Sequence, residues 1–358
     1  MNVLLTCAGR RSYSVEIFKQ AVRPLGYTVA CDSSGEAPAL QIADRAFTVP
    51  PVDDPTYIDA LLSICEAHDI DLLVPALEPE LLLLAAERAR FLDVGTMPLV
   101  SSPEVVTTCY DKLATGEFLA PCGVSVPRTF ESLEAARAAL SADPGGRRLV
   151  VKPRWGVSSI GLHFAEDDEE LELSYRLARK QVSRSLLAQI SATDAQRSIL
   201  IQERLVGDEY GLDVINNLSG TYVCTLVKRK LRMRAGQTDR AVTVRDERLE
   251  MIGRVIGENL GHVGPLDCDA FVTPQGCYVI DMNPRIGGGY PFSHVAGANL
   301  PAALVAWADG RRPDPACFQM EPNVMASRDD TLVVINQKQI VVPCRSNGKV
   351  LQEVSQAA

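Results

Sequence analysis

The sequence lacks the cysteine patterns of metal-binding and redox proteins. It contains ten cysteines, but no two of them form a CxxC pair and none belongs to a Cys/His cluster. This scatter argues against a structural zinc site and against a redox-active dithiol. Isolated thiols of this kind are typical of proteins from a reducing compartment.

Long apolar runs and a surplus of basic residues are also missing. The most apolar window, DIDLLVPALEPELLLLAA, is interrupted by acids and prolines well before it could span a membrane. The N-terminus, MNVLLTCAGRRSYS, has neither the charged region nor the long apolar region of a signal peptide. A formal net charge of -9 argues against general affinity for nucleic acids. We therefore expect a cytoplasmic protein that binds no membrane and no nucleic acid.

The first part of the chain, up to about residue 105, alternates between strand-like and helical patterns. A helical pattern covers Val15 to Val22, and YIDALLSICEAHD is helix-like. Alternation of this kind predicts parallel βαβ units in a Rossmann-like α/β domain. The strand-like runs are MNVLLTC, GYTVACDSS, DRAFTVP and IDLLVPAL.

The remainder of the chain has the texture of an α+β protein. Closely spaced strands such as YGLDVINN and TYVCTLVKR, with turns such as NNLSG between them, predict antiparallel sheet. DERLEMIGRVIGENLG has helical apolar spacing and ends on a glycine, as helices often do. DCDAFVTPQGCYVID predicts two strands around a Pro-Gln-Gly turn, and TLVVINQKQIVVP is a last strand-like run in the C-terminal tail.

A dinucleotide-binding fold is one interpretation of the N-terminal part. CAGRRSYS follows the first strand, and Asp32 stands near the end of the second. Only Gly9 is present where the dinucleotide fingerprint has three glycines. A nicotinamide-dependent oxidoreductase would have to rest on this loop alone.

The last hairpin carries a candidate metal site. Asp269 begins one strand and Asp281 ends the next, twelve positions later, so both carboxylates can lie at the same end of neighbouring strands. Asn283 faces the same side as Asp281, because side chains alternate along a strand. Two carboxylates and an amide oxygen suit Mg²⁺ held between protein and phosphates. A pair of solvated acids at the strand ends is the alternative.

Three further segments could bind a nucleotide. In VVKPRWGVSSIGLHF, Lys152 ends an apolar strand and is followed by a loop of small residues, namely Gly156, Ser158, Ser159 and Gly161, whose backbone can approach phosphate oxygens. In ILIQERLVGDEYGLDV, the turn between Glu203 and Glu209 can offer backbone groups to adenine and a carboxylate to ribose. Lys112 supplies a second cation. Taken singly, the glycine-rich loop could be a flexible turn, and Glu203 and Glu209 could be exposed acids without a ligand.

The order of these segments along the chain resembles the ATP-grasp superfamily, including the synthetase domains of the carbamoyl phosphate synthase large subunit and amino-acid ligases. The resemblance covers roughly residues 1–310 and implies an ATP-grasp fold preceded by a Rossmann-like domain. We expect four parts: a Rossmann-like domain (1–105), a small ATP-grasp subdomain with the glycine-rich loop (106–195), a large subdomain with the metal site (196–312) and a tail or small subdomain (313–358).

Carried over residue by residue, the resemblance implies ATP and Mg²⁺ as cofactors. Lys112 and Lys152 match the phosphate-binding lysines, and Gly156 to Gly161 the loop that closes over the phosphates. Gln202, Glu203 and the backbone near Leu205 match the adenine hinge, and Glu209 the ribose ligand. Asp269, Asp281 and Asn283 match the metal positions, and Arg285 matches an arginine that helps to hold the transferred phosphate or the acyl phosphate. Family members commonly have glutamate where Asp269 or Asp281 stands, which leaves the number of metal ions open.

The resemblance predicts a carboxylate–amine or amino-acid ligase that forms an acyl phosphate. Its partners would be a small carboxylate and an amine. The basic segment Val227 to Val244 suggests that Arg232 and Arg234 capture the substrate carboxylate, with Gly236 as a hinge. A solvated basic loop is the alternative. His294 is a candidate general base or else a cap, and Trp155 a cover for the nucleotide or a packing residue.

Two rival functions remain open in the sequence. The same phosphate chemistry could act on bicarbonate or carbamate, although only one grasp unit is visible and no glutaminase-like Cys/His/Glu arrangement stands out. A nucleotide-binding regulator without turnover is the second rival. The oligomeric state is not fixed by sequence, although a homodimer is the commonest outcome.

Overall fold

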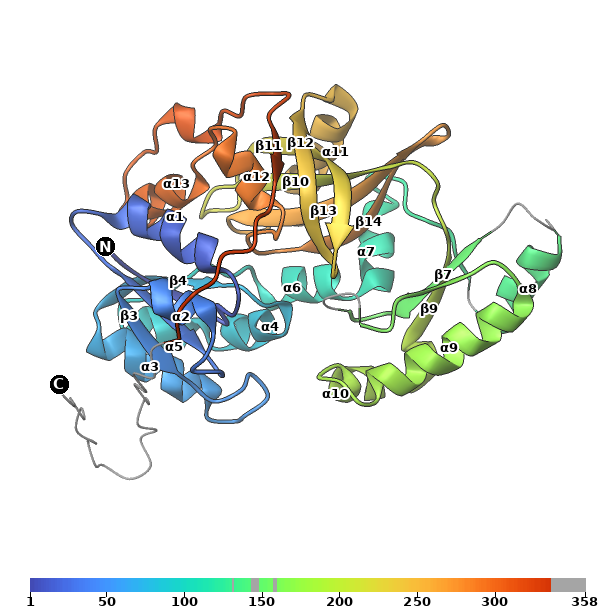
Figure 1. Ribbon diagram of the computed structural model, residues 1–358, viewed down its shortest axis with the longest axis horizontal. Helices are drawn as coiled ribbons and strands as arrows, with labels where there is room; N and C mark the ends of the chain where they lie inside the picture. Colours follow the sequence, from blue (N-terminus) through green and yellow to red (C-terminus); the bar gives the residue numbers. More distant parts are fainter. Residues whose placement is uncertain (131, 143–147, 157–159, 336–358) are drawn as a thin grey trace.

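The computed structural model describes residues 1–130, 132–142, 148–156 and 160–335. Figure 1 shows an N-terminal unit in blue, a small sheet with long helices in green, and a large sheet between and above them. Within the described ranges, no helix combines the length and the apolarity needed to cross a bilayer.

The N-terminal unit is a parallel sheet in the order β3-β2-β1-β4-β5, with helices on both faces. From β1 the strand order continues to β2 and β3 on one side and to β4 and β5 on the other. The loops after β1 and β4 therefore flank this switch point at the carboxyl edge, where open α/β sheets bind ligands. The predicted Rossmann-like domain is confirmed. Its strands are β1 (Asn2–Thr6), β2 (Thr28–Asp32), β3 (Arg45–Thr48), β4 (Ile70–Pro75) and β5 (Met97–Pro98), and its helices are α1 (Ser12–Val22), α2 (Pro38–Ile42), α3 (Tyr57–Ala67), α4 (Glu78–Ala86) and α5 (Arg88–Asp93).

Two short helices, α6 (Pro103–Tyr110) and α7 (Lys112–Leu119), lead to the small antiparallel sheet, ordered β6-β9-β7-β8. Its core is closed by α9, which buries Leu171, Ala178 and Val182. The sheet runs to the end of β9, past residue 195, where we expected the small subdomain to end. Its strands are β6 (Thr129–Phe130), β7 (Leu149–Pro153), β8 (His163–Ala165) and β9 (Ile199–Glu203), and its helices are α8 (Leu133–Ser141), α9 (Asp168–Val182), α10 (Ala188–Ala192) and the 3₁₀ turn η1 (Ala195–Arg197).

The large sheet is antiparallel throughout, in the order β14-β13-β10-β11-β12-β15. This confirms the antiparallel pairing predicted from the close strand spacing. The strands are β10 (Asp208–Asn216), β11 (Tyr222–Arg234), β12 (Gln237–Val244), β13 (Pro265–Thr273), β14 (Gly276–Asn283) and β15 (Met325–Ser327), and the remaining elements are α11 (Glu247–Leu260), α12 (Tyr290–Val295), α13 (Leu300–Ala308) and the 3₁₀ turn η2 (Pro315–Phe318).

The C-terminal tail differs from the prediction. Residues 331–335 of the predicted strand TLVVINQKQIVVP are not in a strand, and the rest of that run lies outside the described residues. The tail instead contributes β15, which pairs with β12 through Ala326 and Ala241.

Helix α11 covers one face of the large sheet, so this face is apolar and buried and the opposite face carries the charged residues. Leu249 and Ile256 of α11 pack with Leu212, Val214 and other apolar residues of β10, β11 and β13. Because side chains alternate along each strand, the charged residues between these apolar ones point to the opposite face. The helix can approach closely because Gly253 and Gly257 face the sheet.

We expect Gly253→Ala to destabilise the fold. A Cβ at Gly253 would stand 2.2 Å from Oγ1 of the buried Thr225. Overpacking of this kind costs about 1–3 kcal/mol and outweighs the gain in helix propensity, about 1 kcal/mol. Gly116 of α7 is the matched control, because its Cβ would meet only Val126 Cγ2 at 3.8 Å. In urea unfolding, Gly253→Ala should lower the midpoint and Gly116→Ala should not; equal midpoints for the two variants would contradict this packing argument.

Candidate functional site

The hairpin of β13 and β14 places four oxygen-bearing side chains on one face of the large sheet. Asp269 pairs with Asp281, and Asp267 pairs with Asn283. Residues directly opposite each other in an antiparallel pair share a face, and so do residues two apart. The predicted metal residues are therefore brought together, with Asp267 as a neighbour that the sequence interpretation missed.

Strands β10 and β11 extend this charged face. Lys230 Nζ lies 2.8 Å from Glu209 Oε1 and 2.7 Å from Asp269 Oδ1. Burial disfavours the charge of Lys230, but Asp269 and Glu209 outweigh this effect and raise its pKa. Burial also raises the pKa of Asp269, in part offset by Lys230. Gly211 leaves space for two lysines above it, because a Cβ there would lie 3.3 Å from Lys228 Cε and 3.5 Å from Lys230 Cε.

Lys112 of α7 and Lys152 of β7 approach the hairpin beside its edge strand, β14. Lys112, the first residue of α7, lies with its Nζ 2.9 Å from Asp281 Oδ1. Lys152, in β7, donates to the carbonyl of Ile280 at 3.5 Å, within a β-bulge of β14. Burial and the charge of Lys112 lower the pKa of Lys152 to about 8. Burial opposes the ionisation of Asp281, but Lys112 and Lys152 overcome it and hold its pKa below the usual value.

Arg285 connects the large sheet to the N-terminal unit. Its Nε donates to Glu78 Oε1 at 3.0 Å, its Nη2 also contacts that oxygen, and its Nη1 donates to Asp267 Oδ2 at 2.7 Å. Burial opposes the charge of Arg285, yet Glu78 and Asp267 raise its pKa. Glu78 was not predicted. It follows a strand at the sheet's switch point, and that position is the signal that could have identified it.

These groups surround a cavity of about 270 Å³. The N-terminal unit contributes Arg11 and Glu78 to its wall, and the hairpin of β11 and β12 contributes Met233, Gly236 and Gln237. Of the predicted residues, the lining includes Lys112, Lys152, Gly156, Glu209, Asp269, Asp281, Asn283 and Arg285.

A second cavity of about 50 Å³ adjoins the first and shares Lys112 and Ile280 with it. Gln202 and Thr129 form part of its wall, and Gln202 Nε2 donates to Thr129 Oγ1 at 2.8 Å. Val126, Pro127 and Val279 make the rest of the wall largely apolar.

Several predicted residues lie elsewhere. Glu203 accepts from the backbone N–H of Arg128, 2.9 Å from its Oε1, and neither Glu203 nor Leu205 lines either cavity. Gly161, with φ +70°, packs on Pro153 outside both linings. Ser158 and Ser159 lie outside the described residues.

Arg232 and Arg234 point away from the large cavity. Both are exposed; Arg232 pairs with Asp239, and Arg234 pairs with Asp239 and with Asp330 of the C-terminal tail. Neither arginine lines the cavity, although Met233 between them does. Gly236 and Ala235 both have positive φ and form the tight turn of the hairpin, which strand twist favours. The substrate roles of the two arginines stay predictions.

His294 and Trp155 pack into the structure. His294 Nδ1 lies 3.1 Å from Tyr290 Oη on α12, and burial lowers its pKa. Trp155 is buried, and the guanidinium carbon of Arg154 lies 4.5 Å from the centre of its ring. Neither residue lines either cavity.

The donor set of the hairpin fits a magnesium ion shared with a phosphate ligand. Among the described residues, no three His, Cys, Asp or Glu side chains are grouped as a metal cage. Asp269, Asp281 and Asn283 supply hard oxygen ligands, and Mg²⁺ usually takes only one or two carboxylates and completes its shell with water and phosphate. Lys230 and Lys112 neutralise the two carboxylates.

Comparison with known proteins agrees with this geometry. Residues 3–99 match a family model described as a PylC-like N-terminal domain, and residues 109–289 match one described as an ATP-grasp domain. The chain is 25% identical, over 79% of its length and 70% of the relative's, to the formate-dependent phosphoribosylglycinamide formyltransferase of Synechococcus sp. (strain CC9311).

Solved structures show the same fold. The biotin carboxylase domain of 2-oxoglutarate carboxylase from Hydrogenobacter thermophilus, solved with MgADP and bicarbonate, superposes with a TM-score of 0.67 at 18% identity, covering 87% of this chain and 70% of that one. N5-carboxyaminoimidazole synthetase from Staphylococcus aureus gives a TM-score of 0.62 at 14% identity, covering 88% and 78%. The predicted ATP-grasp fold, the use of ATP and Mg²⁺ and the ligase class are confirmed, and the chain belongs to the ATP-grasp family.

Proposed function

We propose that this chain joins a small carboxylate to an amine at the expense of ATP, through an acyl phosphate formed in the large cavity. One observation carries the proposal: Lys112 and Lys152 converge on Asp281 and the carbonyl next to it, and Asp281 lies opposite Asp269 in the hairpin. Lys112 is 2.9 Å from Asp281, and Lys152 contacts the adjacent carbonyl of Ile280. Cations and metal-binding oxygens side by side are what a magnesium–triphosphate complex needs.

The two cavities suggest how ATP lies in the site. The small cavity is largely apolar with a few polar groups, as adenine pockets are. Lys112 lines both cavities, so a nucleotide with its base in the small one would extend its phosphates past Lys112 toward Lys152 and Asp281. Glu209 lines the large cavity, which supports the proposal that it binds the ribose.

The chemistry asks for alignment and charge neutralisation. A carboxylate oxygen of the substrate attacks the γ-phosphorus, the bond to the β–γ bridging oxygen breaks, and ADP leaves. The amine nitrogen then attacks the acyl carbon, the carbon–oxygen bond to phosphate breaks, and the nitrogen loses a proton as phosphate departs. Lys112 and Lys152 hold the phosphate charge in place. Asp269, Asp281 and Asn283 would hold Mg²⁺, which would supply further charge neutralisation.

The second substrate enters beside the N-terminal unit. Arg11 follows β1 and Glu78 follows β4, and both line the large cavity. Among the described residues, Arg11 has no side-chain hydrogen bond or ion pair, so its guanidinium is available for a substrate anion.

ADP release in the presence of paired substrates tests the function. We expect ADP to form only when a carboxylate and an amine are both present, and a screen of such pairs, with formate included because a relative is formate-dependent, should identify them. ADP formation with bicarbonate and ammonia alone would instead indicate carbamoyl phosphate chemistry. ATP binding without ADP formation under any pairing would indicate a regulator and contradict the proposal.

Asp281→Asn should strongly reduce turnover while preserving the fold. The substitution keeps the size of the side chain but removes the charge that faces Lys112 and the expected metal ion. Loss of one electrostatic group of this kind lowers kcat by about 10²–10³-fold. Asp208→Asn, an exposed acid on the same sheet, is the control. If ADP formation by Asp281→Asn matched that of Asp208→Asn, the assigned metal site would be wrong.

Arg11→Gln should weaken the binding of the anionic substrate without affecting the binding of ATP. A charge-assisted hydrogen bond contributes about 1.5–3 kcal/mol, so KM for the anionic substrate should rise about tenfold or more, with KM for ATP unchanged. Arg10→Gln is the matched control, because Arg10 is exposed and outside the lining. Steady-state kinetics with each substrate varied in turn would separate the two effects; equal rises for both variants would contradict the assignment.

A further inference from the structure

Arg154 and Asp111 form a two-point ion pair at the junction of the small sheet and α7. Arg154 Nε donates to Asp111 Oδ1 at 2.7 Å, and Arg154 Nη2 donates to Asp111 Oδ2 at 2.5 Å. Both side chains are largely buried, with 14% and 8% of their surface exposed. Such pairs combine strength with a fixed orientation. Neither residue lines the large cavity, so the proposed reaction does not use them directly.

Each partner is directly connected to one of the two cavity lysines. Asp111 is the N-cap of α7, accepting from the backbone of Leu113 at 3.0 Å, and Lys112 is the first residue of that helix. Arg154 follows Lys152 by two residues in the chain. The backbone N–H of Lys112 also donates to the carbonyl of Arg154 at 3.2 Å.

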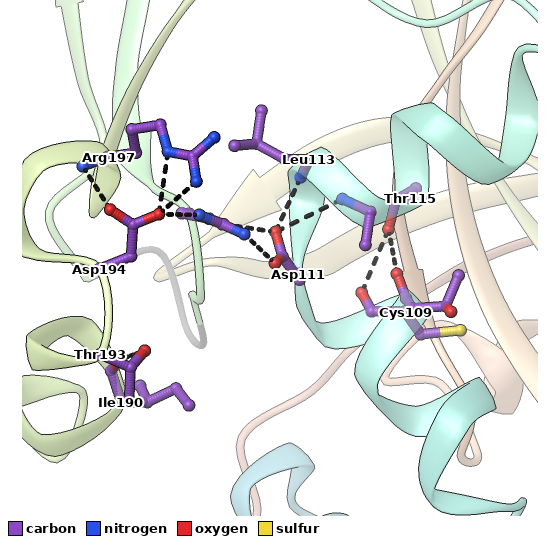
Figure 2. A network of polar contacts seen from close by, with 11 residues as sticks. Cys109, Asp111, Leu113, Thr115, Ile190, Thr193, Asp194 and Arg197 are labelled. Carbon is purple, nitrogen blue, oxygen red and sulfur yellow. Dashed lines mark hydrogen bonds and ion pairs between the residues drawn. The ribbon is translucent and has the colours of Figure 1, made fainter.

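A third group continues the network. Arg154 Nη1 donates to Asp194 Oδ2 at 2.8 Å, and Asp194 also binds Arg197. Figure 2 shows Asp111 at the start of α7 facing Asp194 and Arg197 across the junction. Within this network, the Arg154–Asp111 pair is the contact that ties the segment that carries Lys112 to the sheet that carries Lys152.

The Arg154–Asp111 ion pair affects the relative positions of Lys112 and Lys152. Lys112 and Lys152 come from separate segments and repel each other, yet their ammonium groups converge on Asp281 and on the carbonyl of Ile280 beside it. We propose that the Arg154–Asp111 pair positions the two lysines at the separation that binds the phosphates of ATP. This inference rests on the proposed ATP site, and it makes Arg154 and Asp111 positioning residues.

Asp111→Asn isolates the ion pair, because asparagine caps a helix as well as aspartate does while losing the charge. Calorimetric titration with a non-hydrolysable ATP analogue and Mg²⁺ should show Kd rising about tenfold or more. Asp194→Asn is the matched control: it removes a charged partner of Arg154 but leaves the Asp111 pair, and Kd should stay within about twofold. Thermal unfolding of every variant identifies any general loss of fold.

A mutant cycle with Lys112→Gln separates positioning from a merely structural role. If Asp111 acts through the lysines, Asp111→Asn should raise Kd by less than about twofold in the Lys112→Gln background. An unchanged Kd for Asp111→Asn alone, or the same factor in both backgrounds, would overturn the inference. If the wild-type chain binds no analogue, the proposed ATP site is wrong as well. If the wild-type chain binds the analogue and Asp111→Asn leaves Kd unchanged, only the positioning role is wrong.

Discussion

The pairing of buried carboxylates with basic side chains on one face of the large sheet is the interaction on which the site depends. Lys230 lies between Glu209 and Asp269, Lys228 binds Asp213 at 2.6 Å, and Lys112 binds Asp281. Isolated charges at such burial would cost several kcal/mol each. The alternation of each strand sends these charges to the cavity and the apolar residues to α11. A magnesium–nucleotide complex carries both signs of charge, so it can replace the partners of both the acids and the lysines without leaving a charge buried alone.

Local spacing was enough to predict much of the fold and the hairpin of the site. The run from Asp269 to Asp281, with a turn between them, brings the two acids to the same end of neighbouring strands once these pair. A β-bulge at Ile280 then sets Asp281 directly opposite Asp269. The helical period from Leu249 to Ile256 and the glycine after it predicted α11, whose cap Gly261 has φ +70°. These features depend on residues close in the chain. The end of the hairpin that carries the acids can therefore be derived from its sequence, whereas the β-bulge that brings them to one face cannot.

Contacts between distant segments could not be derived in the same way. Glu78 and Arg285 are 207 residues apart, and only the packing of the N-terminal unit on the large sheet brings them together. The basic segment from Lys228 to Arg234 shows the converse limit. Its charge surplus suggested Arg232 and Arg234, but Lys228 and Lys230 line the cavity instead, because register shifts between Lys230 and Arg232 and between Arg232 and Met233 interrupt the alternation of β11. Net charge identifies a segment, whereas register decides which of its side chains reach the ligand.

The environment of Arg285 changes what that residue can contribute. A guanidinium has five N–H donors. Its Nε and one Nη2 donor contact Glu78, and its two Nη1 donors reach Asp267 and the carbonyl of Ile286, which leaves one donor uncommitted. Two carboxylates also offset its single charge. In this arrangement Arg285 holds the N-terminal unit against the hairpin of β13 and β14. In the proposed function, the cationic contacts to phosphate would therefore fall chiefly to Lys112 and Lys152, which is consistent with a separate ion pair, Arg154–Asp111, that sets the separation of the two lysines.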